Sequence, residues 1–109
     1  MIALNVFKTK TAVITTDNVS IYTAPEGKSA IILMAQIANT TNTGGTVTVF
    51  HYFDSTNTEL LKDFSIPGND AASAVMGKLV LESGHQLYVS ASDNDKFKIT
   101  LSILESVNG

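Results

Sequence analysis

The sequence holds few residues of the types that carry catalysis or bind metal ions. His51 and His85 are its two histidines, it has no cysteine, and it has no His-Glu-x-x-His spacing. A structural zinc site would therefore have to use scattered carboxylates. His51 falls within an apolar, strand-like segment and His85 within a turn, which favours a packed or solvent-facing role for each. We predict no metal site.

One acidic cluster and the many serines give no stronger indication of chemistry. Asp93-Asn94-Asp95 resembles the first half of a calcium-binding loop, but Lys98 stands where that loop requires glycine and the later glutamate is missing. No serine lies in a Gly-x-Ser-x-Gly motif, and no phosphate-binding glycine loop occurs. We therefore read the acidic cluster as a turn, and we predict no catalytic residue, no cofactor and no enzymatic activity.

Length, charge and composition limit the classes of partner. A chain of 109 residues is predicted to form one domain, residues 1–109, with a single core. Its net charge of −3 and its lack of arginine argue against a nucleic-acid partner. No apolar run approaches the ~20 residues of a membrane-spanning helix. Only 16% of the residues are charged, so the surface is either neutral and polar or covered by neighbouring subunits, and we favour the second.

The last third of the chain has the clearest secondary-structure pattern. Apolar residues alternate with polar ones in three successive segments, which is typical of half-buried strands. Ser83-Gly84-His85 supplies the turn between the first two segments. We predict a three-stranded meander with one apolar face. The inward-facing residues are Leu79 and Leu81, then Leu87, Val89 and Ala91, then Phe97, Ile99, Leu101 and Ile103.

The rest of the chain reads as further strands separated by frequent turns. Residues 1–10 alternate and are predicted to form a first strand or an extended arm. Pro25-Glu26-Gly27 makes a firm turn, because proline fixes φ and glycine permits a positive φ. Residues 71–76 are expected to form an irregular crossing segment. With eight or nine short strands and no helical periodicity, the predicted fold is an all-β antiparallel sandwich, with jelly-roll topology favoured.

The sequence also resembles a family of small virion structural proteins of tailed bacteriophages, of the type found in marine cyanobacterial phages. The resemblance runs over nearly the whole chain and preserves the order of its blocks. This family commonly has an acidic residue after Ser83-Gly84, where this chain has His85. The blocks are Val6-Phe7-Lys8-Thr9, Ile21-Tyr22-Thr23-Ala24-Pro25-Glu26-Gly27, Met34-Ala35-Gln36-Ile37-Ala38-Asn39, Ile66-Pro67-Gly68-Asn69-Asp70, Gly77-Lys78-Leu79-Val80-Leu81-Glu82-Ser83-Gly84 and Leu101-Ser102-Ile103-Leu104-Glu105.

The resemblance implies a component of the virion that is assembled in the host cytoplasm. Its expected role is to decorate or cement the capsid, or to serve as a neck or tail accessory that bridges neighbours such as the major capsid or tail proteins. The alternative is a glycan-binding β-sandwich module of a tail fibre or adhesin. Carbohydrate recognition usually needs exposed aromatic platforms, and this sequence has no tryptophan and only three tyrosines.

One segment predicts how subunits associate. Residues 30–38 are apolar on both faces of the expected strand, and a strand without a polar face must be covered on both sides. The cover is either another part of the same chain or a symmetry-related copy. We predict a homo-oligomer, with a trimer expected by family analogy. The candidate interface residues are Ile2, Leu4, Val6 and Phe7 of the first strand and Ile32, Met34 and Ala38 of the two-faced strand.

Overall fold

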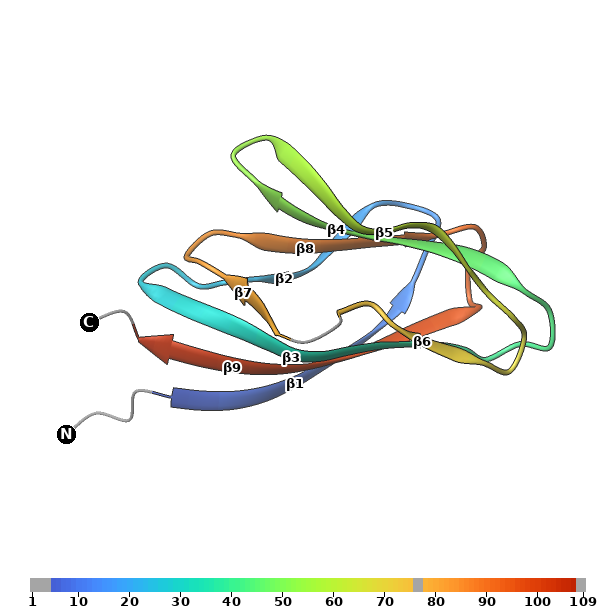
Figure 1. Ribbon diagram of the computed structural model, residues 1–109, viewed down its shortest axis with the longest axis horizontal. Coiled ribbons are helices and arrows are strands. Elements are labelled where there is room, and N and C mark those ends of the chain that lie inside the picture. Colours follow the sequence, from blue (N-terminus) through green and yellow to red (C-terminus); the bar gives the residue numbers. More distant parts are fainter. Residues whose placement is uncertain (1–4, 76–77, 108–109) are drawn as a thin grey trace.

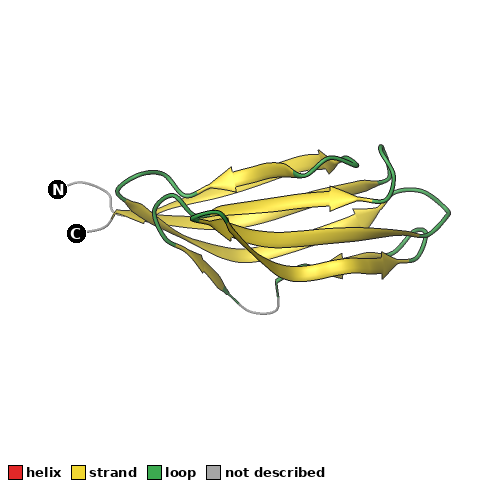
Figure 2. Cartoon of the chain, turned by 90° about the horizontal axis from the view of Figure 1, so that it is seen from above, coloured by secondary structure: helices red, strands yellow, loops and turns green. Residues whose placement is uncertain are grey.

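The protein is a sandwich of two antiparallel β-sheets, seen in a computed structural model that describes residues 5–75 and 78–107. The strands run along the length of a molecule of 50 × 27 × 21 Å, with the loops gathered at its two ends (Figure 2). The described residues form no helix, and hence none long and apolar enough to cross a membrane. They form the strands β1 (Asn5–Ile14), β2 (Val19–Thr23), β3 (Lys28–Asn39), β4 (Gly45–Phe53), β5 (Thr56–Ile66), β6 (Ala71–Ser73), β7 (Leu79–Leu81), β8 (Gln86–Ala91) and β9 (Phe97–Val107).

The order of the strands is that of a jelly roll, which confirms the predicted all-β sandwich. One sheet, here called sheet A, has the order β1-β9-β3-β6, with β7 also paired to β3 (Figure 1). The other, sheet B, has the order β2-β8-β4-β5. The antiparallel pairs β1·β9, β2·β8, β3 with β6 and β7, and β4·β5 form one long folded ribbon. Rolling that ribbon brings β9 beside β3 and β8 beside β4.

The predicted meander of the last three strands is wrong. The structure places β7 and β9 in sheet A and β8 in sheet B, so each connection crosses from one layer to the other. The inward residues of that stretch were nevertheless predicted correctly in β8 and β9, where Leu87, Val89 and Phe97 are buried. Alternation depends only on which side of a strand faces the core, and it does not identify the neighbouring strand.

The core lies between the two sheets and is built mainly from aliphatic side chains. Two turns beside it take the predicted form: Gly27 has φ 78° after Pro25, whose carbonyl accepts from Lys28 N at 3.1 Å. Gly84 has φ 83°, and the carbonyl of Glu82 accepts from His85 N at 2.9 Å. The largest fully buried side chains include Phe97, Ile14, Ile32, Ile37, Ile66, Leu81, Leu87, Ile99, Leu101 and Ile103.

Two segments differ from their predicted boundaries. The first strand continues unbroken to Ile14, because every residue of β1 from Asn5 to Ile14 pairs with β9 in one register. Part of the expected irregular segment, Ala71–Ser73, forms the short strand β6, while residue 76 lies outside the described residues. Pairing within sheet A decides both cases, since β1 pairs with β9 and β6 pairs with β3.

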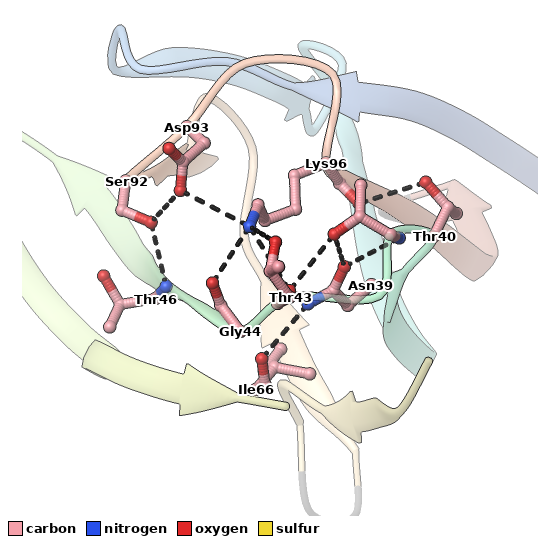
Figure 3. A network of polar contacts seen from close by, with 10 residues as sticks. Asn39, Thr40, Thr43, Gly44, Thr46, Ile66, Ser92, Asp93 and Lys96 are labelled. Atoms are coloured by element: carbon pink, nitrogen blue, oxygen red, sulfur yellow. Dashed lines mark hydrogen bonds and ion pairs between the residues drawn. The ribbon is translucent and has the colours of Figure 1, made fainter. Parts of the chain in front are cut away.

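A network of polar contacts holds the loops at the end of the sandwich where β3 meets β4 (Figure 3). Lys96 Nζ donates to Thr43 Oγ1 at 2.8 Å and to the carbonyl of Gly44 at 2.9 Å. The buried side chain of Asn39 donates to the carbonyls of Thr43 and Ile66, at 2.8 and 3.2 Å. Burying these polar groups costs little because they are hydrogen-bonded.

In the same region Gly68 lies against the backbone of residues 42 and 43. A Cβ atom at Gly68 would come within 2.7 Å of Thr43 N and 2.5 Å of the carbonyl oxygen of Asn42. Both are backbone atoms, which cannot easily move away. We expect Gly68→Ala to lower the free energy of unfolding by about 1–3 kcal/mol, measured by urea denaturation. Gly44→Ala is the matched control, because its Cβ would meet its nearest atom at an ordinary 3.6 Å. Equal urea midpoints for the two variants would contradict the close approach.

Candidate interaction surface

The predicted two-faced strand, β3, changes its inward face at a β-bulge. Its register against β9 shifts between Ile32 and Met34, so Leu33 is an extra residue in the strand. Ala30 and Ile32 point into the core before the bulge, and Ala35 and Ile37 do so after it. The prediction that placed Ile32 and Met34 on one face is therefore wrong, because a bulge exchanges the faces beyond it.

The predicted interface residues consequently fall into three groups. Ile2 and Leu4 lie outside the described residues. Ile32 is fully buried between the sheets and faces no surface. Met34 and Ala38 are half-buried on the outer face of sheet A, the face turned away from sheet B. Of the β1 residues, Phe7 shares that outer face and is 74% exposed, whereas Val6, which is also exposed, pairs with the inward-facing Glu105.

The outer face of sheet A carries a row of four apolar side chains that runs across four strands. Phe7 of β1 is paired with Leu104 of β9, Leu104 with Ile31 of β3, and Ile31 with Val80 of β7. Directly opposite residues point to the same face of a sheet. Phe7 and Val80 at the two ends are 74% and 55% exposed, and Leu104 and Ile31 between them are half-buried. This set is here called the outer row.

Most of the residues that flank the outer row are polar, and Met34 is the apolar exception. The next pairings toward one end are Asn5 with Ser106 and Ser106 with Ser29, and toward the other Thr9 with Ser102 and Ser102 with Met34. An apolar strip bordered mainly by polar residues is typical of a surface that is covered in an assembly. The sequence contained this signal in Ile31 and Val80, but the pairing that aligns them with Phe7 and Leu104 depends on the fold.

A buried carboxylate ties the two sheets together at the same end of the sandwich. Glu105 of β9 is 2% exposed, and its Oε2 accepts from the hydroxyl of Tyr22 in β2 at 2.5 Å. Its Oε1 lies 3.1 Å from Lys8 Nζ and 3.8 Å from Lys28 Nζ, without a well-aligned hydrogen bond. Burial alone would raise the pKa of Glu105, but the Tyr22 hydrogen bond and the two lysines outweigh it and lower that pKa. Burial and the neighbouring carboxylate raise the pKa of Tyr22.

The two histidines meet, although 34 positions separate them in the sequence. His51 Nε2 and His85 Nδ1 are 2.8 Å apart, and the His85 ring stacks on Phe53 with centroids 4.0 Å apart. His51 pairs with the buried Leu87, so it lies on the inward side of β4 near the β7–β8 turn. Burial, followed by the neighbouring His85, lowers the pKa of His51. No third metal-ligating side chain joins the pair among the residues that the structure describes.

The lowered pKa values of His51 and Glu105 predict a protein that loses stability in acid. The folded state holds His51 neutral while the unfolded chain binds a proton near pH 6.5, so stability present above that pH is lost as the pH falls through the folded pKa. The lowered pKa of Glu105 acts in the same direction below about pH 4.5. We expect the melting temperature to fall in two steps, of which His51→Gln removes the upper one. A melting temperature that is constant from neutral pH to pH 5 in the wild-type protein would contradict this assignment.

The aromatic side chains of sheet B contact one another rather than forming a platform. Phe50 stacks on Tyr88 with centroids 5.1 Å apart, and Tyr52 meets the same ring edge-on at 5.4 Å. These are cross-strand pairs between β4 and β8, so packing accounts for them. An apolar pocket of about 400 Å³ lies away from these rings and is lined by Leu60, Leu61, Phe64, Ser73, Ala74, Val75, Lys78 and Leu79.

Comparison with known proteins shows the fold in other assemblies. No protein-family model matches the sequence, and no curated protein matches it. Several solved structures have the same fold at low sequence identity. The capsid structure of the Helicobacter pylori bacteriophage KHP30 contains a chain that is 10% identical, with a TM-score of 0.57 over 98% of this chain and 90% of that one.

Two further neighbours agree with it. A chain in the capsid of cyanophage Pam1 is 17% identical, with a TM-score of 0.51 over 96% of this chain and 87% of that one. A chain from the disulfide-linked pili that form Bacillus endospore appendages is 12% identical, with a TM-score of 0.56 over 96% and 88% of the two chains. The fold of this protein therefore occurs in phage capsids and in a bacterial pilus, at nearly full length in each case.

Proposed function

We propose that the protein is a structural subunit of a bacteriophage virion that covers its outer row against a neighbouring subunit. The observation that carries the proposal is the outer row itself, four aligned apolar side chains on the solvent-facing side of a jelly roll. The occurrence of the same fold in phage capsid chains supports it. So does the resemblance of the sequence blocks to small virion proteins of tailed phages.

The specific role we propose is to decorate or cement the capsid, or to act as a neck or tail accessory that bridges major capsid or tail proteins. Covering the exposed parts of Phe7 and Val80 would each contribute at most about 1.5–3 kcal/mol, the value for burying a whole side chain, before the entropy lost on association is subtracted. A contribution of this size at each contact is modest, so it suits a subunit whose contacts are repeated many times on a particle. The subunit would be assembled into the virion in the host cytoplasm.

The first neighbour that we propose is a second copy of the chain. A homo-oligomer, with a trimer as the family analogue, would cover the outer row by symmetry. Phe7 from the predicted arm and Met34 and Ala38 from the predicted strand remain part of this surface, joined by Ile31, Leu104 and Val80. Glycan binding is the weaker alternative, because the rings of Phe50, Tyr52 and Tyr88 are occupied by one another.

Localisation on the particle tests the proposal. An antibody or gold label against the protein should bind intact, purified virions at repeated positions on the head, neck or tail. The number of copies per particle, measured by quantitative mass spectrometry, should be a multiple of the number of subunits in a symmetric oligomer. A protein found only in the lysate, absent from particles purified by density gradient, would overturn the virion role.

A further inference from the structure

The free edge of β1 is the feature of the molecule that the outer row does not explain. β1 lies at the end of sheet A, and among the described residues it pairs only with β9, so its other side presents backbone N–H and C=O groups that no described strand pairs. The pairing with β9 runs through all ten residues without a register shift. Most side chains of the strand are exposed, and it contains no proline. A long, regular edge of this kind is a template for another strand.

The other edges of the two sheets are each interrupted. β2 has five residues and a register shift between Ser20 and Tyr22. β5 has two shifts against β4, with Asp63 at φ 46°. β6 and β7 have three residues each. Short strands and bulges are the usual means by which sheet edges are kept from pairing, and among the described strands β1 alone lacks both.

The charge of the edge indicates what it would accept. β1 carries Lys8 and Lys10 and no carboxylate, and the two lysines lie on the same side of the strand. Lys8 contacts Glu105, but Lys10 has no ion-pair partner among the residues that the structure describes. The strands of sheet A hold one carboxylate in all, the buried Glu105. An otherwise acidic protein therefore presents a basic edge.

The same lysines oppose pairing of β1 with a second copy of itself. An antiparallel two-fold pair centred on Thr9 would place Lys8 opposite Lys10 of the second copy. A pair centred on Lys10 would place that residue opposite its own counterpart. Like charges directly opposite one another destabilise a strand pair, and these two registers overlap most of the strand. The charge pattern thus selects against self-pairing and in favour of an acidic strand.

We infer that the free edge of β1 binds an extended acidic segment of another protein, which extends sheet A by one strand. Two carboxylates at alternate positions of that segment lie opposite Lys8 and Lys10. An apolar side chain of that segment lies opposite Phe7 and packs beside it on the outer face, where Phe7 is 74% exposed. This inference does not depend on the place of the protein in a virion, because it concerns the isolated subunit and a strand of stated chemistry.

The experiment uses the full chain and an acetylated octapeptide, VTETEIVT, whose two glutamates would lie opposite Lys10 and Lys8 in antiparallel pairing. Binding is measured by fluorescence anisotropy, and the site by amide hydrogen exchange. We expect saturable binding that slows exchange at alternate amides of β1. The counterpart VTKTKIVT should bind about tenfold more weakly, because its lysines face Lys8 and Lys10. The counterpart VTEPEIVT should not bind, since proline removes a backbone donor.

Lys10→Glu is the matched variant of the protein. Lys10 is exposed, so the melting temperature should stay at the wild-type value. The preference for VTETEIVT over VTKTKIVT should disappear, because each peptide then forms one attractive and one repulsive pair with residues 8 and 10. Equal affinity of the wild-type protein for the acidic and basic peptides, or binding that leaves β1 amides in fast exchange, would overturn the inference. So would slow exchange of β1 that appears without peptide as the protein concentration rises, which would identify a second copy as the occupant.

Discussion

Ile32→Asp is expected to unfold the protein, whereas Ile31→Asp leaves it folded and abolishes its association. Ile32 is fully buried between the sheets, and an unpaired carboxylate there should cost more than about 4 kcal/mol, a large part of the total stability of a domain. Ile31 points to the opposite face, in the middle of the outer row. There the carboxylate is solvated, and the cost to folding should be about 1 kcal/mol.

Circular dichroism and light scattering at the same protein concentration separate the two effects. The Ile31→Asp variant should keep the β-sheet spectrum of the wild type and give the molar mass of a monomer by light scattering. A folded Ile32→Asp variant would contradict the bulge at Leu33 that turns this residue inward. An Ile31→Asp variant that stays assembled would show that the outer row is not the contact between subunits.

Glu105→Ala is expected to lower the free energy of unfolding by about 2–4 kcal/mol at neutral pH. The change removes the acceptor of the buried Tyr22 hydroxyl and the negative charge shared by Lys8 and Lys28. A buried hydroxyl left without a partner and a cavity at the same place account for this magnitude. Urea denaturation at pH 7 measures it.

Two variants divide that loss between hydrogen bonding and charge. Glu105→Gln keeps the size of the side chain and an oxygen that can accept from Tyr22, so it should lose only the part due to charge. Tyr22→Phe should lose only the hydrogen bond. If Glu105→Ala were as stable as the wild type, the contact between β2 and β9 would contribute nothing to the sandwich.

The predictable part of the fold was the part fixed by local pattern. Alternation of apolar residues identified the inward face of β9, and the pairs Pro25 with Gly27 and Ser83 with Gly84 identified two turns, since each depends on residues close in sequence. The all-β sandwich and its jelly-roll order agreed with the expectation. The meander was wrong, because the choice between two sheets for each strand depends on contacts far apart in the sequence.

The candidate surface could be predicted only in part, for a physical reason located at one residue. Without Leu33 as an extra residue in the strand, Ile32 and Met34 would share a face, as the alternation implies. The bulge places Ile32 in the core and leaves Ile31 and Met34 outside. Predicting the outer row requires the registers of three strand pairs, and predicting the contact of His51 with His85 requires the pairing of β4 with β8. A local sequence pattern contains neither kind of information.

The most direct test of the virion role and of its contact surface is thiol accessibility in the particle. The chain has no cysteine, so Val80→Cys in the outer row and Thr58→Cys on the exposed strand β5 each introduce a single reporter. Both thiols should react rapidly in the isolated, unassembled subunit. In purified particles that carry either variant, the account predicts that the thiol of Val80→Cys is protected while that of Thr58→Cys still reacts. A Val80→Cys thiol that reacts as fast in the particle as in the free subunit would contradict the account.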